Sequence, residues 1–304
     1  MRTFGLLLAL FPATVLGQQD FSKVDVTSTD LGRGVHMLVG AGGNLGVSTG
    51  PDGAFLIDDQ FAPLTPKIQA AIARFSPQPV RFVVNTHWHG DHSGGNENFG
   101  KAGSLIVAHE NVRRRMSTEQ FMEAMNRRVP ASPAGALPVV TFTDTISFYV
   151  NGDTLRVFHV RNAHTDGDAI VWLRAANVVH MGDAFVNGTY PFIDVSSDGS
   201  LRGIVAAADR VLAAVDDRTK IIPGHGALAT RADLQRYRDL LAQVHARLLA
   251  DARRGRTVEQ VLAAGLTKQW DAAWGAGFMK PDVFTRLAYE SVRRELRPAG
   301  RRGR

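Results

Sequence analysis

The length and composition of the chain are those of a protein with a full hydrophobic core. Of its 304 residues, 44% are hydrophobic and 21% are charged, which excludes a largely disordered chain. The formal net charge is +6, but the last eight residues supply four arginines. We therefore interpret the basicity as a solvated tail over residues 298–304, and we expect no nucleic-acid partner.

The first residues are typical of a secretory signal peptide. Arg2 precedes an apolar stretch from Phe4 to Leu16, and Gly17 stands before a polar run. Pro12 interrupts this stretch, which at about a dozen residues is shorter than the roughly 20 of a membrane-spanning helix. A membrane anchor and a buried N-terminal helix are the alternatives. The sequence predicts a signal peptide over residues 1–17, a periplasmic or secreted protein, and no membrane span after cleavage.

The chain contains no cysteine. Exported proteins often carry disulfides, so this one depends on its core and on any bound metal for stability. Metal ligands in this chain must be His, Asp or Glu.

The segments before residue 130 predict a sheet followed by alternating strands and helices. Extended segments separated by Gly-rich turns, typical of an antiparallel meander, occupy residues 22–29, 34–40, 44–50 and 54–59. Apolar spacing over residues 65–75 predicts a helix with Thr65 as its N-cap before Pro66. A buried strand over residues 80–86 follows, and residues 104–125 repeat the order of strand, then helix.

The same pattern recurs in the second half. The predicted strands occupy residues 139–143, 145–150, 153–160, 168–174, 177–182 and 219–224, with a helix over residues 200–215 before the last of them. Two halves of this kind predict two sheets packed together with helices outside. The predicted C-terminal helices occupy residues 231–254, 257–266 and 281–296. Residues 265–281 are predicted to be a loop that packs Trp270 and Trp274 against the core, and a loop that reaches toward the site is the alternative. No linker divides residues 18–297, so we expect one domain.

The segment "VVNTHWHGDHSGGN", residues 83–96, concentrates metal-ligating side chains after a predicted strand. His87 and His89 are two apart, so their side chains project to the same side of an extended chain. Gly90 permits a sharp turn. Asp91 and His92, being adjacent, point differently and suit a second centre. The alternative is a polar loop that only closes the strand.

Further candidate ligands lie at the ends of later strands. His164, Asp183 and His225 each stand where an apolar strand gives way to a turn of small residues. Five histidines and two aspartates at strand ends favour a metal site. The other histidines lie within predicted strands or helices and are interpreted as structural: His36, His109, His159, His180 and His245.

The motifs "HWHGDH", "AHTDGD", "MGDAF" and "PGHG", in this order, resemble the metallo-β-lactamase-fold hydrolase superfamily over about residues 24–240. The resemblance implies an α/β fold, an αββα sandwich in which two mixed sheets pack face to face with helices on both outer faces. It also implies two zinc ions per chain, the first held by His87, His89 and His164. The second would be held by Asp91, His92 and His225, with Asp183 bridging and Asp58 supporting the ligand loop from behind.

This resemblance implies a metal-dependent hydrolase in which a metal-bridging hydroxide, oriented by Asp91, attacks a small-molecule substrate. The bond is an ester, lactone, thioester or amide. Because it lacks cysteine and has Asp183, the chain resembles the branch with lactonases, thioesterases and phosphodiesterases more than it resembles the β-lactamases. A β-lactam is still one of the possible substrates. The alternatives are a phosphodiesterase of the same fold and a non-catalytic, metal-binding periplasmic accessory protein. Iron and manganese also suit these ligands.

Residues near the candidate ligands could line a substrate cleft. The candidates are Trp88, Asn187, Tyr190 and Phe192. Residues 128–138 are rich in proline and apolar side chains, and they form either a loop over the cleft or a simple connection.

Overall fold

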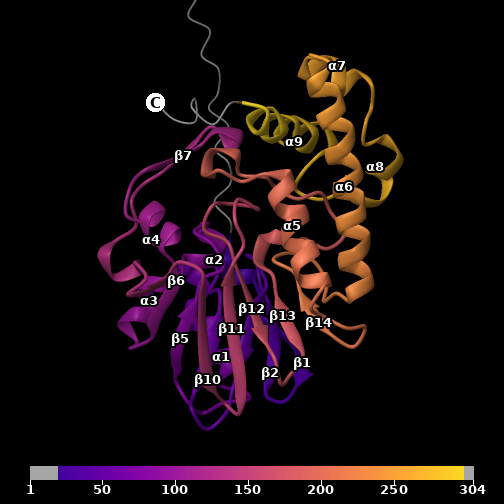
Figure 1. The fold of residues 1–304 in the computed structure, drawn as a ribbon. Helices are drawn as coiled ribbons and strands as arrows, with labels where there is room; N and C mark the ends of the chain where they lie inside the picture. The colour runs from indigo at the N-terminus through magenta and orange to yellow at the C-terminus, as the bar shows by residue number, and fades with distance from the viewer. Residues whose placement is uncertain (1–19, 298–304) are drawn as a thin grey trace, which may run out of the picture.

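Two β-sheets lie face to face at the centre of the structure, a computed structural model that describes residues 20–297 (Figure 1). The predicted signal peptide and the basic tail lie outside the described residues. The first sheet comprises, in spatial order, β1 (Thr27–Gly32), β2 (Val35–Val39), β3 (Leu45–Ser48), β4 (Ala54–Ile57), β5 (Val80–Val84), β6 (Leu105–His109) and β9 (Val140–Phe142). The second comprises β10 (Thr145–Val150), β11 (Asp153–His159), β12 (Ala169–Leu173), β13 (Val178–His180) and β14 (Lys220–Ile222).

Both sheets are mixed. Strands β1 to β4 form the predicted antiparallel meander, whereas β4, β5, β6 and β9 run parallel. In the second sheet β10 to β13 are antiparallel and β14 is parallel to β13. The carboxyl ends of parallel strands meet at one edge of a sheet, so the segments that follow β4 and β5 leave side by side.

Buried apolar side chains form three layers. Between the sheets, Phe55 and Val84 of the first pack in one cluster with Val157 and Val171 of the second. On the outer face of the first sheet lie α1 (Thr65–Ile72) and α3 (Asn96–Lys101). On the outer face of the second lie α5 (Leu201–Leu212), α6 (Arg231–Arg253) and α9 (Pro281–Glu295). Figure 1 shows α3 on one side of the strands and α5 and α6 on the other. The predicted αββα sandwich is therefore confirmed.

Several element boundaries differ from the sequence prediction. Helix α1 begins at Thr65 itself, and the residue before it, Leu64, makes no side-chain cap, so Thr65 is not the N-cap. The predicted strand over 22–29 begins only at β1, because residues 21–23 form a 3-10 turn, η1 (Phe21–Lys23). The loop predicted over 265–281 contains α8 (Lys268–Trp274), although Trp270 and Trp274 do pack against the core. A further helix, α7 (Val258–Ala263), precedes it.

The largest departure is in residues 104–129. Helix α4 (Glu110–Met116) ends early, and the chain then forms β7 (Gln120–Met122), η3 (Glu123–Met125) and β8 (Arg127–Val129). Asn126 has left-handed backbone (φ 47°), which reverses the chain and lets β7 pair antiparallel with β8. The prediction of a single helix up to residue 125 was therefore wrong. The remaining short helices are η2 (Ala62–Leu64), α2 (Gly90–Ser93), η4 (Ala134–Ala136), η5 (Gly182–Ala184) and η6 (Val195–Ser197).

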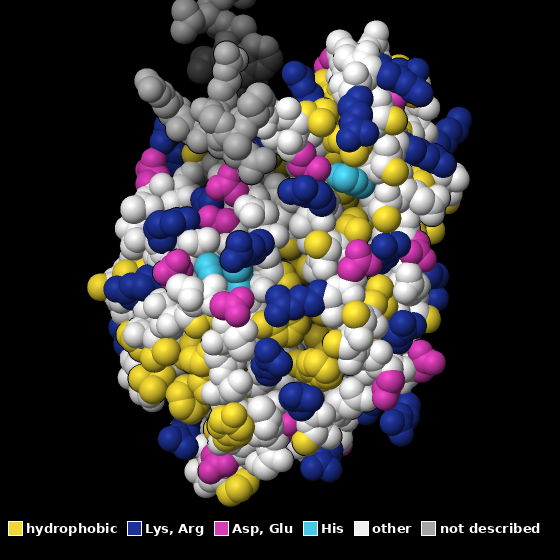
Figure 2. All heavy atoms as spheres, viewed as in Figure 1, with side chains coloured by type: hydrophobic (Ala, Val, Ile, Leu, Met, Phe, Trp, Pro, Cys, Tyr) yellow, Lys and Arg dark blue, Asp and Glu magenta, His cyan; other side chains and the backbone are white. Residues whose placement is uncertain are grey.

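Charged side chains are mixed on the surface. On the face shown in Figure 2, Lys and Arg are scattered among Asp and Glu and do not gather into one stripe. Over residues 20–297, no helix combines the length and the hydropathy that a membrane crossing requires.

Asn151 joins the two sheets at the end opposite the carboxyl ends of β4 and β5. It lies in the turn between β10 and β11 with left-handed backbone (φ 54°). Its Nδ2 donates to the Gly53 carbonyl (2.9 Å), and its Oδ1 accepts from the Asp52 amide (3.1 Å). The Asp52 carboxylate in turn accepts from the Asn151 amide (2.7 Å).

We expect Asn151→Ala to lower the free energy of unfolding by about 1–3 kcal/mol, because it removes these side-chain bonds and because alanine adopts left-handed backbone less readily than asparagine does. Asn151→Gly should cost less, since glycine adopts this backbone freely. Urea unfolding of both variants measures the difference. Unchanged stability in both would contradict the role of Asn151 in joining the sheets.

Candidate metal centre

The candidate ligand loop, residues 85–92, is held by one buried carboxylate. Because β4 runs parallel to β5, Asp58 after β4 lies beside Thr86 after β5. Asp58 accepts hydrogen bonds from the Thr86 amide (2.7 Å), the Thr86 hydroxyl (2.8 Å) and His92 Nδ1 (2.8 Å). His87 Nδ1 in turn contacts the Thr86 hydroxyl (3.1 Å). Asp58 thus orients His92 directly and His87 through Thr86, the supporting place that the resemblance implies.

Three histidines form the first group. His164 Nε2 lies 2.9 Å from His89 Nδ1. The centroid of the His87 ring lies 4.8 Å from that of His89 and 4.7 Å from that of His164. The far nitrogens are fixed: His164 Nδ1 donates to the Phe192 carbonyl (2.8 Å), and His89 Nε2 donates to Asp194 Oδ2 (3.0 Å). The remaining nitrogens of the three rings therefore face one another.

The second group is built around α2 and the turn after β14. His225 Nε2 lies 3.3 Å from both His92 Nε2 and Asp91 Oδ2. Asp183, in η5 after β13, stands between the groups. Its Oδ1 lies 3.1 Å from His92 Nε2, and its Oδ2 lies 3.5 Å from His225 Nε2 and 3.8 Å from His164 Nε2.

The structure brings all seven sequence-predicted residues together. Their nitrogen and oxygen atoms form three sets, each within 4.8 Å: His87, His89 and His164; His87, His92 and Asp183; Asp91, His92 and His225. Close approach of the backbone makes this possible. A Cβ at Gly224 would lie 2.0 Å from Asp183 Oδ1, so only glycine fits there.

The chemistry of these atoms fits a metal ion. His87 Nε2 is buried and has no hydrogen-bond partner among the described residues. Asp183 Oδ1 is also buried, and although it lies 3.1 Å from His92 Nε2, the two groups are not aligned for a hydrogen bond. An unpaired buried polar atom costs about 1–3 kcal/mol, a cost that a bound cation would remove. Imidazole and carboxylate donors without sulfur suit Zn²⁺, and they also suit iron and manganese.

The candidate histidine ligands differ in the direction of their pKa shifts. Burial holds the pKa of His87 well below its usual range and lowers the pKa of His164 to about 4, so both rings are neutral at pH 7, the form that binds metal. Burial also opposes charge on His92 and His225, but the Asp183 and Asp91 carboxylates, joined at His92 by Asp58, together outweigh it. The pKa of His225 rises to about 9 and that of His92 rises well above its usual range. Asp183 thus favours positive charge at this point, from protons or from metal.

A sequence model of the metallo-beta-lactamase superfamily matches residues 39–226, more than half of the chain. This chain belongs to the metallo-β-lactamase superfamily. The family supports a metal-dependent hydrolase in general, and the histidine and aspartate groups described above are its candidate metal-binding residues.

Individual relatives are distant. A metallo-beta-lactamase type 2 of Bacteroides fragilis is 23% identical over 238 residues, which are 74% of this chain and 90% of the relative. A metallo-beta-lactamase structure from Pontibacter korlensis is 21% identical with a TM-score of 0.59, covering 72% of this chain and 99% of the other. The sec-alkylsulfatase Pisa1 from Pseudomonas sp. is 18% identical with a TM-score of 0.64, covering 87% of this chain and 50% of the other. These likenesses confirm the metallo-β-lactamase fold.

Asp194 is a site residue that the sequence analysis missed. Besides His89, its carboxylate accepts from the Ser196 and Ser197 hydroxyls, and Ser197 Oγ in turn accepts from Trp88 Nε1 (3.2 Å). The string Asp-Val-Ser-Ser signals a local turn, which the Asp194 carboxylate does cap. Its approach to a ring 105 residues earlier has no local signal.

The centre of this metallo-β-lactamase fold opens into a cavity of about 500 Å³. Trp88, Tyr190 and Phe192 line it, as predicted. Asn187 is not among the lining residues, because its side chain donates instead to the Ala227 carbonyl (3.0 Å). The prediction for Asn187 was therefore wrong.

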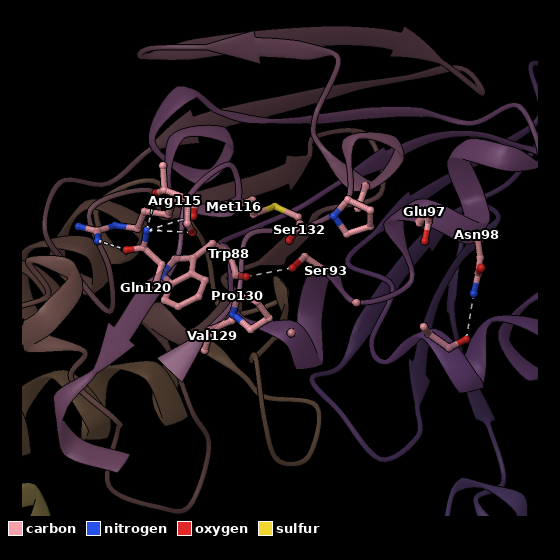
Figure 3. Close-up of a pocket in the computed structure, with 16 residues that line it drawn as sticks. Trp88, Ser93, Glu97, Asn98, Arg115, Met116, Gln120, Val129, Pro130 and Ser132 are labelled. Carbon is pink, nitrogen blue, oxygen red and sulfur yellow. Dashed lines mark hydrogen bonds between the residues drawn. The ribbon is translucent and has the colours of Figure 1, made fainter. Parts of the chain in front are cut away.

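Residues 128–138 form a wall beside the centre. Val129 lines the main cavity and also an adjacent cavity of about 210 Å³, which Pro130 and Ser132 help to enclose. Trp88 lines both cavities, and Figure 3 shows its ring next to Val129 and Pro130. Within residues 128–138 only Val129 lines the main cavity, so the segment lies beside the cleft, which is neither of the two alternatives.

We expect Asp194→Asn to weaken metal affinity about 10- to 100-fold, because the charged acceptor that orients His89 is lost. Competition with a chromogenic chelator measures this affinity. Asp198→Asn is the matched control, since Asp198 lies on the same turn with its side chain 68% exposed and has no contact with a candidate ligand. Equal affinity in the two variants would show that Asp194 does not support the centre.

Proposed function

We propose that this protein is a dinuclear zinc hydrolase that cleaves an ester, lactone, thioester or amide bond in a small molecule. The observation that carries the proposal is the position of Asp183, whose two carboxylate oxygens face histidines of both groups. A carboxylate shared in this way suits two metal ions side by side, and the cavity next to it gives a substrate access.

In this proposal His87, His89 and His164 hold the first zinc. Asp91, His92 and His225 hold the second, and Asp183 is shared. Bound zinc would supply Lewis acidity and a water molecule acidic enough to act as a nucleophile near neutral pH.

Asp91 is the residue we propose to handle the proton. Its side chain is 30% exposed and lines the cavity. Burial opposes its ionisation, but the charge of His92 and the hydrogen bond with His225 outweigh burial and hold the pKa of Asp91 below its usual range. An ionised carboxylate here can orient the attacking water through the oxygen that would not hold the metal, accept its proton there and return it to the leaving group.

The aromatic walls would position the rest of the substrate. Trp88, Tyr190 and Phe192 are at most 9% exposed and line the cavity. They present apolar surface that excludes water from the scissile bond. A β-lactam is one candidate cyclic amide, since two of the relatives carry the name metallo-beta-lactamase.

We further propose that the mature chain starts near Gln18, folds as one domain to Arg297 and works in the periplasm or outside the cell. The apolar segment from Phe4 to Leu16 supports this location. N-terminal sequencing of protein recovered from the periplasm and the medium tests it.

We expect Asp91→Asn to lower kcat by about 100-fold or more in protein that keeps its full zinc content, because the amide cannot accept a proton. Steady-state kinetics together with metal analysis separates this effect from metal loss. Asp217→Asn, at a side chain 94% exposed, is the control. A normal kcat in zinc-replete Asp91→Asn would refute the proton-handling role.

A panel of lactones, thioesters, aryl esters and β-lactams should include at least one substrate turned over faster than bis-p-nitrophenyl phosphate. Chelator should abolish this turnover, and added zinc should restore it, since the centre supplies the nucleophile. A faster phosphodiester reaction would replace the proposal with a phosphodiesterase. Protein that holds two zinc ions and turns over nothing would favour an accessory metal-binding role.

A further inference from the structure

The cavity has a wall that the proposed chemistry does not use. Three of the seven methionines of the chain line it, Met122, Met125 and Met279, together with Phe278. Phe278 is 72% exposed and Met125 is 36% exposed, so large apolar side chains stand open at the mouth. Exposed apolar surface beside a cavity marks a binding surface, and methionine adapts to apolar groups of different shape.

One arginine, Arg127, lines the same cavity. Arg127 lies on β8 directly opposite Met122 of β7, and both side chains contribute to the lining. The guanidinium of Arg127 makes no ion pair or hydrogen bond with any other residue in the part of the chain that the structure describes. The lining carboxylates, Asp91 and Asp183, lie against His92 and His225.

Arg128, the residue after Arg127, already has partners within the protein. Arg128 contacts Glu119 (2.6 Å) and lies over the Phe121 ring, 5.6 Å from its centroid. It is not among the residues that line the cavity. Arg127 alone of this pair is therefore available to a molecule in the cleft.

The segment that carries Arg127 is anchored to the rest of the fold. Arg294 of α9 lies 3.6 Å from the Glu123 carboxylate in η3 and donates to the Val195 carbonyl (2.5 Å). These contacts connect the segment from β7 to β8 with the helix that packs on the second sheet. Arg127 is thus presented from a supported element at one wall of the cleft.

We propose that the cleft binds an amphipathic anion, with an apolar chain or ring against Met122, Met125, Phe278 and Met279 and with an oxyanion group on Arg127. The planar guanidinium donates two parallel hydrogen bonds to a carboxylate or a sulfate, which a neutral head group cannot accept in the same way. The type of bond that is cleaved is taken from the proposed function, and to that extent the inference rests on it. It narrows the substrate to acyl or cyclic compounds that carry one anionic group.

Binding of unreactive ligands tests the inference apart from hydrolysis. Butanoate, hexanoate and octanoate, 1-octanol and 1-octanesulfonate are titrated into the protein by calorimetry, with and without added zinc. Affinity should rise by about 2- to 4-fold for each added methylene, because the chain is buried against the apolar wall. Affinity that does not depend on chain length would overturn the apolar part of the proposal.

The head group is tested with matched arginine variants. Arg127→Gln should weaken binding of octanoate or 1-octanesulfonate about 5-fold or more, leave binding of 1-octanol within 2-fold, and do so with and without zinc. Arg128→Gln should leave the affinity for all three unchanged. Dependence of only one of the two anions on Arg127 identifies the head group as a carboxylate or as a sulfate-like group. If neither depends on it, or if both depend only on zinc, the anion is not on Arg127 and the inference fails.

The apolar wall has its own matched pair. Phe278→Ser should reduce the chain-length dependence, whereas Tyr149→Ser, at an aromatic side chain 80% exposed outside the cavity, should not. Equal behaviour of the two variants would remove Phe278 from the proposed site. None of these ligands contains a bond that the proposed hydrolase cleaves. Binding that depends on chain length and on Arg127, without turnover of any substrate, would therefore refute the proposed function alone. Turnover of a substrate without these two dependences would refute the inference alone.

Discussion

The carboxylate of Asp58 is the constraint on which the centre depends. It is fully buried and accepts three hydrogen bonds, from the Thr86 amide, the Thr86 hydroxyl and His92 Nδ1. Parallel pairing of β4 with β5 places it there, so the register of the first sheet determines the orientation of two candidate ligand rings. An error of one residue in that register would turn Asp58 to the other face and leave both rings without their supporting group.

The second sheet completes the arrangement. His164, Asp183 and His225 follow or precede its strands, and their side chains reach the loop held by Asp58 only because the two sheets pack face to face. The buried His87 Nε2 has no hydrogen-bond partner among the described residues, so a bound cation would stabilise this meeting point. A metal bound there as proposed would also stabilise the fold of a chain that has no disulfide.

Much of the fold and the candidate site could be predicted from sequence. Period-two and helical spacing identified most strands and helices of the sandwich, because burial of one face imposes those periods. The prediction failed at residues 117–125, where a helix was expected and the chain instead forms β7 and η3 before it enters β8. There Asn126 in left-handed backbone reverses the chain, and apolar spacing carries no information about that reversal. The prediction that Asn187 lines the cleft was also wrong, because its side-chain amide donates to the Ala227 carbonyl.

The sequence by itself determined the types of the candidate ligands, their places after strands and the absence of any cysteine thiolate, because these are properties of residue identity and local order. The tertiary structure alone decided which nitrogen of each ring faces the centre, since that depends on partners such as Asp194, 105 residues from His89. It also decided that Arg127 lines the cleft while Arg128 does not. Two adjacent arginines have the same local sequence, and only the packing of distant segments distinguishes them.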